Sequence, residues 1–308
     1  MTVEFGWNSS NSAQISLAII APFRIRDIFE GERSYKDDQM PKFPFEMVPL
    51  PADRSTTKPR QTGITMMVDF NLPVGQLEDM LGLIGPYVDL IKIAVGTARL
   101  YRESYLSQKI RLCEGYDVKP FIGGQFLEYA VATQGFDVAP AFYKEAKRMG
   151  FEAVEVSDNC VPLSANQRKM LISQGVDAGL EIHGEIGSKD IKQTPETLIA
   201  QAHDCLDAGA DIVLVEAAEM IIDGEVQEHL VSALEMEFPR EKVIYELPGP
   251  WIERVTLSDV YQMKKFLIDR FGPDANIANV KPDDVFETEA LRCGLSVIGP
   301  KEFVPEPN

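Results

Sequence analysis

The hydrophobic pattern of the chain changes near residue 58. Beyond that point, short runs rich in Val, Ile and Leu alternate with longer segments whose apolar residues recur at helical spacing. Short apolar runs bounded by turn residues are typical of strands that are buried on both faces. The pattern predicts strands at Ile64–Val68, Val88–Ile93, Val118–Ile122, Ala153–Val156, Leu180–Glu185, Asp211–Val215, Lys242–Tyr245 and Asn276–Val280.

Helices are predicted between the strands. Ser164 and Thr194 stand where N-caps are expected, and Gly150, Gly175 and Gly209 stand where three helices are expected to end. The predicted helices are Gln76–Leu83, Glu103–Cys113, Ala139–Met149, Ser164–Gln174, Pro195–Asp207, Glu228–Met236, Leu257–Phe271 and Glu287–Cys293.

Eight strand–helix units in about 240 residues predict an α/β fold, a (β/α)8 TIM barrel spanning residues 58–308. A doubly wound open sheet is the alternative. That fold would need an early Gly-rich phosphate loop, and no GxGxxG motif follows the first predicted strand. Residues 1–57 are rich in Pro, Ser and charge, which predicts an irregular N-terminal extension with one helix near residues 25–30.

The composition of the chain limits the kinds of molecule that it is expected to bind. The formal net charge of -18 predicts repulsion from nucleic acid and from anionic membranes. No apolar run reaches the ~18 residues that a membrane span requires. Four scattered cysteines without a CxxC pair suit a reducing, cytoplasmic location. We expect a small anionic substrate, no nucleic acid or membrane partner, and self-association into a homo-oligomer.

Carboxylates gather at the predicted strand ends. In a barrel, catalytic groups come from the C-terminal ends of several strands. Burying several carboxylates without compensation is strongly unfavourable, and a hard cation such as Mg²⁺ offsets their charge through oxygen ligands. The sequence therefore predicts a Mg²⁺ site at these strand ends, with Glu155, Glu185, Glu216 and Glu246 as the candidate ligands.

The stretch from Glu185 to Asp190 leaves the fifth predicted strand and brings Lys189 to the same loop. Glu185 and Lys189 could act as metal ligand and general acid, or they could form a solvated ion pair. Lys92, inside an apolar strand, meets either an anionic substrate or a glutamate partner. Further substrate-binding candidates near the strand ends are Asp69, Gly96, Thr97, Gly123, Gly124, Ser157 and Asn279.

Other hydrolytic sites are disfavoured. No HExxH motif or histidine cluster is present, which argues against a zinc hydrolase. His183, alone on a strand, is more typical of a core residue than of a ligand. Ser157 lacks a G-x-S-x-G elbow, which argues against a serine hydrolase.

The same residues resemble the phosphosulfolactate synthase family from about Lys58 to Leu295. Those enzymes are (β/α)8 barrels that add sulfite to phosphoenolpyruvate with Mg²⁺, in coenzyme M biosynthesis. The shared order of short motifs makes the resemblance specific. The motifs are KPRQTG at 58–63, YVDLIK at 87–92, GT at 96–97, GG at 123–124, EY at 128–129, GFEAVEVSD at 150–158, EIGSKD at 185–190, DAGAD at 207–211 and NIAN at 276–279.

The resemblance implies roles for several residues. Lys189 matches a lysine that protonates a substrate carbon after the nucleophile adds. Glu185, Glu216 and Glu246 match acidic strand-end positions suited to Mg²⁺, with Glu155 as a further candidate ligand, and Lys92 would help bind the anionic substrate. The bound Mg²⁺ would stabilise the enolate-like charge of the intermediate.

The chain also departs from the family pattern. Val95 stands where the family usually has Trp, and Ala218 and Ser296 stand where it usually has arginines suited to a phosphate. A bidentate Arg–phosphate contact is strong, and Lys is not its equal. Arg60, Arg99 and Lys281 are candidates to compensate.

Three functions follow from this pattern. The first is a Mg²⁺-dependent carbon–sulfur lyase or synthase acting on sulfite and phosphoenolpyruvate or a similar unsaturated carboxylate. The second is a divergent family member that uses a different, non-phosphorylated substrate. The third is a non-catalytic role of the kind suggested by plant heat-stress-associated proteins, which resemble the same family.

Overall fold

The computed structural model describes residues 43–50, 54, 57–188 and 192–297. The chain divides into two units, residues 1–49 and residues 50–308. The described part of the first unit is a short turn, in which Val48 N donates to Phe45 O at 2.8 Å. The predicted helix near residues 25–30 lies outside the described residues, and the predicted domain boundary at residue 58 stays a prediction.

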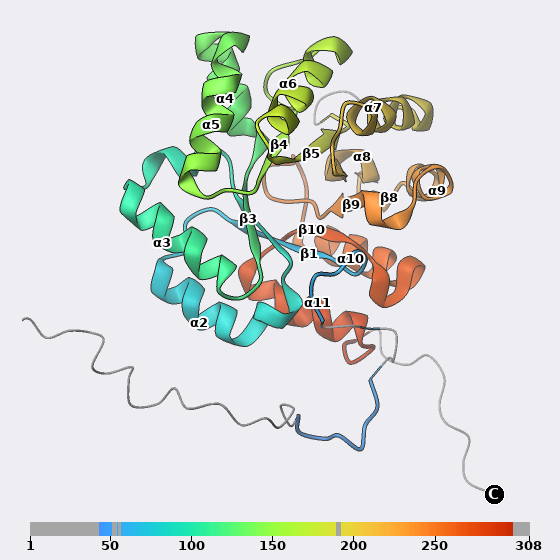
Figure 1. Cartoon of the computed structure of the whole chain (residues 1–308). Coiled ribbons are helices and arrows are strands. Elements are labelled where there is room, and N and C mark those ends of the chain that lie inside the picture. Colours follow the sequence, from blue (N-terminus) through green and yellow to red (C-terminus); the bar gives the residue numbers. More distant parts are fainter. Residues whose placement is uncertain (1–42, 51–53, 55–56, 189–191, 298–308) are drawn as a thin grey trace, which may run out of the picture. The chain divides into compact units, whose positions relative to one another are not determined.

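The second unit contains a closed barrel of parallel strands, ordered β1-β10-β9-β6-β5-β4-β3-β2 in the described chain. Figure 1 shows the strands at the centre with helices around them. Each predicted strand is present within one or two residues of its expected ends, so the fold class is confirmed. The barrel strands are β1 (Thr65–Asp69), β2 (Leu90–Ile93), β3 (Lys119–Ile122), β4 (Ala153–Val156), β5 (Glu181–Ile186), β6 (Ile212–Val215), β9 (Val243–Glu246) and β10 (Ile277–Val280).

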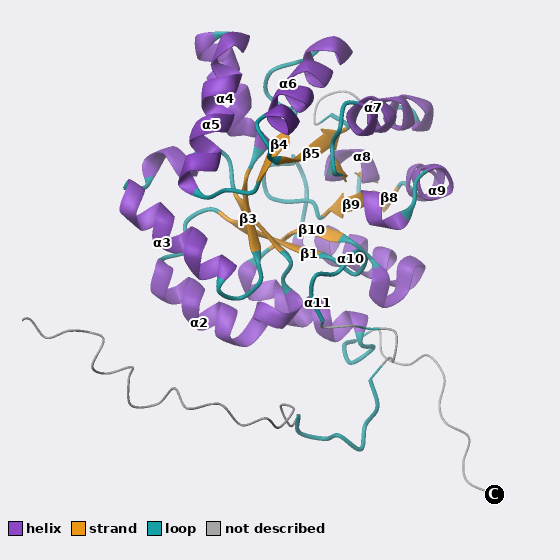
Figure 2. Cartoon of the chain, viewed as in Figure 1, coloured by secondary structure: helices purple, strands orange, loops and turns teal. Residues whose placement is uncertain are grey.

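Helices follow the strands and enclose them, as Figure 2 shows in purple around orange. Their packing against the strands buries one continuous apolar cluster. The α-helices are α2 (Val74–Ile84), α3 (Glu103–Glu114), α4 (Gly124–Gln134), α5 (Ala139–Met149), α6 (Ala165–Asp177), α7 (Pro195–Asp207), α8 (Ala217–Met220), α9 (Glu228–Glu237), α10 (Leu257–Phe271) and α11 (Val285–Arg292).

The predicted caps are largely confirmed. Ser164 forms a capping box with Gln167, and the Thr194 side chain accepts from Thr197 N. The predicted end of α6 at Gly175 is wrong, because the helix continues to Asp177. Gly175 is buried inside α6, where an added Cβ would lie 2.3 Å from Ile182 Cδ1. Its role is close helix–strand packing rather than helix termination.

Two helices and a hairpin in the described chain were not predicted. Helix α4 begins directly after β3, and its glycine start lacks an ordinary cap signal. Helix α8 is a single short turn after β6. It leads into a small hairpin of β7 (Ile221–Ile222) and β8 (Glu225–Val226). Helix α8 and the two hairpin strands carry too few residues for a hydrophobic period to develop.

A second apolar cluster fills the barrel interior with residues contributed by most of its strands. Leu90, Ala153 and Ile244 belong to it, and His183 joins it through an edge contact to Phe121, with 4.6 Å between ring centroids. Side chains alternate along a strand, so the residues two positions further on also face inward. Those residues are Lys92, Glu155, Glu185 and Glu246. The alternation therefore stacks a charged layer on the apolar one.

The N-terminal end of the barrel is fastened by buried ion pairs. Arg60 binds Asp89, just before β2, at 2.8 Å. Arg54 binds Glu289 on α11 at 2.7 Å and also donates to Gly63 O at 2.9 Å. These contacts join the beginning of the barrel unit to its last helix.

No helix in the described part of the chain is both long enough and apolar enough to span a membrane.

Candidate active site

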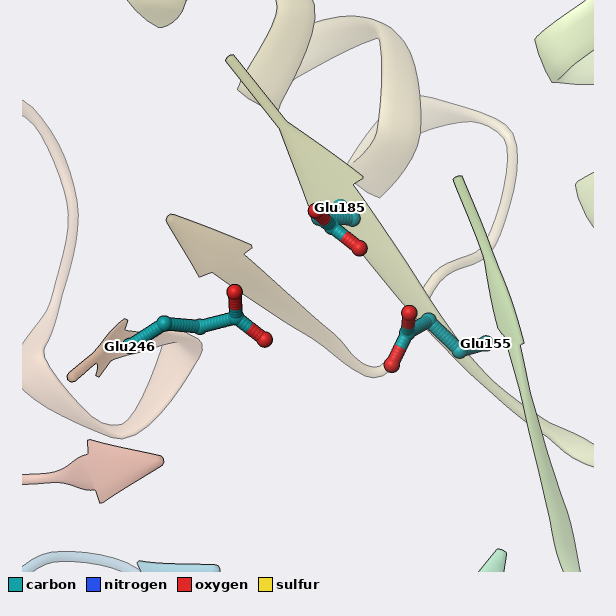
Figure 3. Close-up of side chains that lie close together, drawn as sticks. All are labelled: Glu155, Glu185 and Glu246. Atoms are coloured by element: carbon teal, nitrogen blue, oxygen red, sulfur yellow. The ribbon is translucent and has the colours of Figure 1, made fainter. Parts of the chain in front are cut away.

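Three carboxylates converge at the C-terminal end of the barrel. Glu155 comes from β4, Glu185 from β5 and Glu246 from the last position of β9. One oxygen of each lies within 4.8 Å of the others, and all three residues are buried. Figure 3 shows their carboxylates pointing toward a common space. Tertiary structure thus brings together three of the four predicted metal ligands.

Lys92 places a cation in the same cluster. Its Nζ lies 2.7 Å from Glu155 Oε2 and 2.9 Å from Glu246 Oε1, and its side chain is 10% exposed. Burial alone would lower the pKa of Lys92, but Glu155 and Glu246 raise that pKa well above its usual value. Lys92 is therefore a positive charge in the site. The sequence left open whether Lys92 meets a substrate anion or a glutamate, and the structure shows contacts with two glutamates.

The pKa values of the three carboxylates are shifted in different directions. Burial raises the pKa of Glu185 well above its usual value, and Glu246, Glu155 and Glu216 add to the rise. Burial raises the pKa of Glu246 to about 7, although Lys92 opposes the change. For Glu155 burial is outweighed by Lys92 and by a hydrogen bond with Glu185, so its pKa is lowered. Lys92 therefore favours the ionised form of Glu155, while burial and the neighbouring carboxylates favour the protonated form of Glu185.

This donor set fits a divalent cation. When all three carboxylates are ionised they carry three negative charges against one positive charge on Lys92. Bringing several like charges together in a buried site raises their pKa values unless a cation replaces the protons. Oxygen ligands of this kind suit Mg²⁺.

A cavity of about 130 Å³ opens beside the cluster. Lys92 and the three carboxylates line its polar side. Asn279 on β10 and Gln125 at the start of α4 also line it. Asn279 adopts a left-handed backbone conformation, with φ of 58°. Two amides and a charged cluster therefore share one small cavity.

The glycines after β3 allow the close approach of Glu155. Gly123 and Gly124 line the cavity, and Gly124 N donates to Glu155 Oε1 at 3.1 Å. A Cβ on Gly124 would lie 2.1 Å from Ser157 Oγ. The N-terminus of α4 also adds a partial positive charge that favours the ionised form of Glu155.

Ser157 lies behind this wall and does not line the cavity. Its hydroxyl donates to Glu128 on α4. The other oxygen of Glu128 accepts from Cys160 N at 2.6 Å and Val161 N at 2.8 Å. Glu128 therefore fixes the loop after β4, and this loop directs Asn159 to donate to Glu185. The GFEAVEVSD motif builds the cavity wall through these contacts.

Three other predicted substrate-binding residues also lie away from the cavity lining. Asp69 is fully buried and pairs with Lys109 on α3 at 2.5 Å. Its other oxygen accepts from Leu72 N at 2.8 Å, so Asp69 stabilises the turn after β1. Gly96 and Thr97 shape the turn after β2, where Thr97 Oγ1 donates to Ala94 O at 2.7 Å.

Glu216 is not part of the three-carboxylate cluster. Its side chain accepts from Ala218 N at 3.0 Å and caps α8. It is still close enough for its charge to raise the pKa of Glu185 and of Glu246. Glu216 therefore tunes the cluster electrostatically from a neighbouring position.

Lys189 lies outside the described residues, but both flanks of its loop are anchored by Glu219. Glu219 accepts from Ser188 N at 2.8 Å and from Gln193 N at 3.0 Å. Gly187 has φ of 100°, and a Cβ there would lie 2.8 Å from Glu219 Cγ. The glycine of the EIGSKD motif is therefore required by the turn and by this contact.

The three cations proposed to replace the missing arginines occupy different places. Arg60 forms an ion pair with Asp89 just before β2, at the opposite end of the barrel from the cavity. Arg99 and Lys281 are exposed and follow β2 and β10, at the correct end. Neither belongs to the described residues that line the cavity.

Sequence reasoning missed four residues that shape the site: Phe70, Gln125, Asn159 and Trp251. All four follow barrel strands on loops or at the start of a helix. Their position after a strand was the only sequence signal for a role in the site. That signal is weak, because amide and aromatic residues are common in loops and these four have no distinctive spacing.

Comparison with known proteins identifies the family. A family model described as (2R)-phospho-3-sulfolactate synthase (ComA) matches residues 53–297. The chain belongs to this family. The family resemblance and the prediction of an enzyme are thereby confirmed, since phosphosulfolactate synthases form a carbon–sulfur bond.

Two phosphosulfolactate synthases illustrate the similarity. The protein from Methanothermobacter thermautotrophicus is 30% identical over 249 residues, which are 77% of this chain and 91% of that protein. The protein from Methanocaldococcus jannaschii is 32% identical over 246 residues, with coverage of 76% and 92%. A third relative, Protein HEAT-STRESS-ASSOCIATED 32 of Arabidopsis thaliana, is 22% identical over 263 residues, with coverage of 76% and 87%.

Proposed function

We propose that this protein is a Mg²⁺-dependent synthase that adds sulfite to phosphoenolpyruvate or to a similar unsaturated carboxylate. The observation that carries the proposal is the convergence of Glu155, Glu185 and Glu246 around Lys92 at the C-terminal end of the barrel. The relatives named phosphosulfolactate synthase support the same reaction.

The three carboxylates would hold the metal. Mg²⁺, when bound, would supply positive charge that stabilises an enolate-like carboxylate. Lys92 keeps part of the negative charge neutralised and holds Glu155 and Glu246 in place. Asn279 and Gln125 also line the cavity, and we propose that their side-chain amides orient the polar atoms of the substrate.

The reaction is an addition to a carbon–carbon double bond. Sulfite sulfur forms a bond to the methylene carbon of the acceptor, and the π electron pair moves toward the carboxylate. A proton is then delivered to the carbon that bears the carboxylate, which restores a saturated product. With phosphoenolpyruvate this product is phosphosulfolactate. We propose Lys189 as the proton donor, on the basis of its place in the EIGSKD motif.

The direct test is to incubate purified protein with Mg²⁺, sulfite and phosphoenolpyruvate and to measure phosphosulfolactate by mass spectrometry. We expect a product that depends on Mg²⁺ and on Lys189, with Lys189→Ala losing about 10²–10⁴-fold in rate. No product at high enzyme concentration would reject this substrate pair. Full turnover by Lys189→Ala would reject the proposed general acid.

The metal site is tested separately by calorimetric titration with Mg²⁺. Glu155→Gln, Glu185→Gln and Glu246→Gln should each weaken binding. Glu289→Gln is the matched control, because Glu289 is a buried glutamate that pairs with Arg54 at the other end of the barrel. Unchanged Mg²⁺ affinity in the triple variant of the cluster residues would reject the site.

A further inference from the structure

The cavity has an aromatic rim that the reaction chemistry does not explain. Phe70 lies on the loop after β1, and Trp251 lies on the loop after β9. Their ring centroids are 6.0 Å apart and the rings are tilted by 52°. Strand β10 lies between β1 and β9 in the barrel, so the pair spans the end of the strand that carries Asn279. Both aromatic residues line the same cavity as the carboxylate cluster.

The backbone fixes the position of Trp251. A Cβ added to Gly249 would lie 2.2 Å from Cη2 of the indole and 2.4 Å from two neighbouring ring atoms. The ring therefore lies directly against the bare backbone of Gly249, with Phe70 as its aromatic neighbour. Any side chain at position 249 would therefore displace the indole of Trp251.

The rim leaves apolar surface exposed to the cavity and to solvent. Trp251 and Phe70 are each 40% exposed, and Val95, which also lines the cavity, is 38% exposed. Covering apolar surface is favourable in proportion to the area removed from water. Val95 also has φ of 48°, which is unusual for a β-branched residue.

The two sides of the cavity differ in chemistry. The charged side contains Lys92 and the carboxylates and suits a metal-bound carboxylate group. The rim offers an indole N–H as its polar group and otherwise ring and methyl surface. A phosphate placed against such a rim would lose hydration with few hydrogen bonds in return. An apolar substituent placed there would gain from burial.

We propose that Phe70 and Trp251 select an acceptor with a short apolar substituent, a 2-alkylacrylate, in place of the phosphate of phosphoenolpyruvate. This inference rests on the proposed function, because it assigns the same addition of sulfite to a different acceptor. Sulfur bonds to the methylene carbon, the double bond breaks, and a proton adds to the alkyl-bearing carbon. The product is a 2-alkyl-3-sulfopropionate, and no oxidant or leaving group is required.

The kinetic test compares 2-propylacrylate, methacrylate and phosphoenolpyruvate, each with sulfite and Mg²⁺ and each corrected for the reaction without enzyme. We expect kcat/KM for 2-propylacrylate to exceed that for methacrylate by about tenfold, because two methylenes reach the rim. It should also exceed kcat/KM for phosphoenolpyruvate. A higher value for phosphoenolpyruvate than for both alkylacrylates would overturn the inference.

Variants assign the preference to the rim. Trp251→Ala should abolish the preference for 2-propylacrylate over methacrylate, and Gly249→Ala should reduce it by displacing the indole. Met236→Ala, which removes an apolar side chain that is 82% exposed on α9, should keep it. Circular dichroism checks that each variant is folded. Retention of the full preference in Trp251→Ala would overturn the inference.

A binding measurement separates this inference from the proposed function. The chain has two tryptophans, so in a Trp7→Phe background the emission reports Trp251. The saturated analogues 2-methylpentanoate and 2-phospholactate cannot react. Tighter binding of 2-methylpentanoate, with a blue shift, supports the apolar rim even if no acceptor turns over, in which case the proposed function fails alone. Tighter binding of 2-phospholactate overturns the inference whatever the activity.

Discussion

Lys92 sets the electrostatics of the candidate active site. A lysine in an apolar strand would ordinarily shift toward its neutral form, because burial disfavours the charged form. Here the contacts with Glu155 and Glu246 reverse that tendency. The result is a cation that compensates part of the carboxylate charge and leaves the remainder to protons or to a metal. Individual side chains therefore define a site whose charge depends on pH and on Mg²⁺.

Replacing Lys92 should destabilise the protein. Lys92→Met leaves Glu155 and Glu246 buried without their cation, and breaking such a buried pair by removing one partner costs about 3–5 kcal/mol. We expect a lower free energy of unfolding in urea, partly restored by Mg²⁺. Lys169→Ala, which breaks an exposed pair with Asp204, should change stability little. Equal effects of the two substitutions would contradict a buried compensating role for Lys92.

The pKa of Glu246 predicts a pH dependence of stability without metal. Its pKa rises from 4.5 to about 7 on folding, so between these values the folded protein holds a proton that the unfolded chain has lost. Its contribution to stability therefore falls as pH rises from 4.5 to about 7 and is level above.

The measurement compares urea unfolding of the wild type and Glu246→Gln across this pH range. The wild type should lose up to about 1.4 kcal/mol per pH unit relative to the variant. Saturating Mg²⁺ should abolish the difference in slope, because the metal displaces the proton. A constant difference between the two proteins at every pH would argue against a raised pKa for Glu246.

The loops after β4 and β5 are held by carboxylates that do not line the cavity. Glu128 on α4 fixes the loop after β4 through backbone amides, and Glu219 on α8 does the same for the loop after β5. Burial raises the pKa of Glu219, while the amide hydrogen bonds from Gln193 and Ser188 oppose that rise. Helices that were hard to predict thus supply the groups that orient the candidate catalytic loops.

Removing one of these anchors should impair turnover more than metal binding. Glu219→Ala leaves Ser188 N and Gln193 N without this shared acceptor, so the two residues are no longer held to the same side chain. Because misplacement by about 1 Å can lower a rate about 10²-fold, we expect a loss in kcat of about 10–10²-fold. Steady-state kinetics and Mg²⁺ titration measure the two effects, with the exposed Glu225→Ala as control. Loss of Mg²⁺ affinity equal to the loss in kcat would contradict a positioning role.

The barrel unit joins its first segment to its last helix. Arg54 pairs with Glu289, Arg60 pairs with Asp89, and Lys58 Nζ donates to Tyr116 O and Asp117 O at 3.1 Å. The unit that carries these contacts begins at residue 50, before the boundary predicted at residue 58. Arg54, Lys58 and Arg60 therefore contribute contacts at the N-terminal end of the barrel.

Two truncations distinguish these boundaries. A chain of residues 50–308 keeps all of these contacts and should unfold at nearly the same temperature as the full chain. A chain of residues 61–308 loses Arg54, Lys58 and Arg60, so Glu289 and Asp89 lose the arginines with which they form short ion pairs. We expect its Tm to fall by about 10 °C, which thermal unfolding by circular dichroism would measure. Equal Tm values for the two truncations would show that the segment adds no stability.

The amino-acid sequence by itself determined the strands, most helices and the strand ends at which charged residues gather. These features depend on local periodicity and on capping residues such as Ser164 and Thr194, which a linear pattern records. The inward direction of Glu155, Glu185 and Glu246 also follows from alternation along a strand.

Only the tertiary structure decided which of these residues meet. Glu155 joins the cluster while Glu216 caps α8, although both stand at strand ends. Asp69 forms an ion pair with Lys109. The helical pattern of the sequence did not indicate that Lys109 is buried. Phe70 and Trp251 lie 181 residues apart in sequence and meet only because β1 and β9 flank β10. Closure of the barrel decides which strand ends are neighbours, and this cannot be predicted from local sequence patterns.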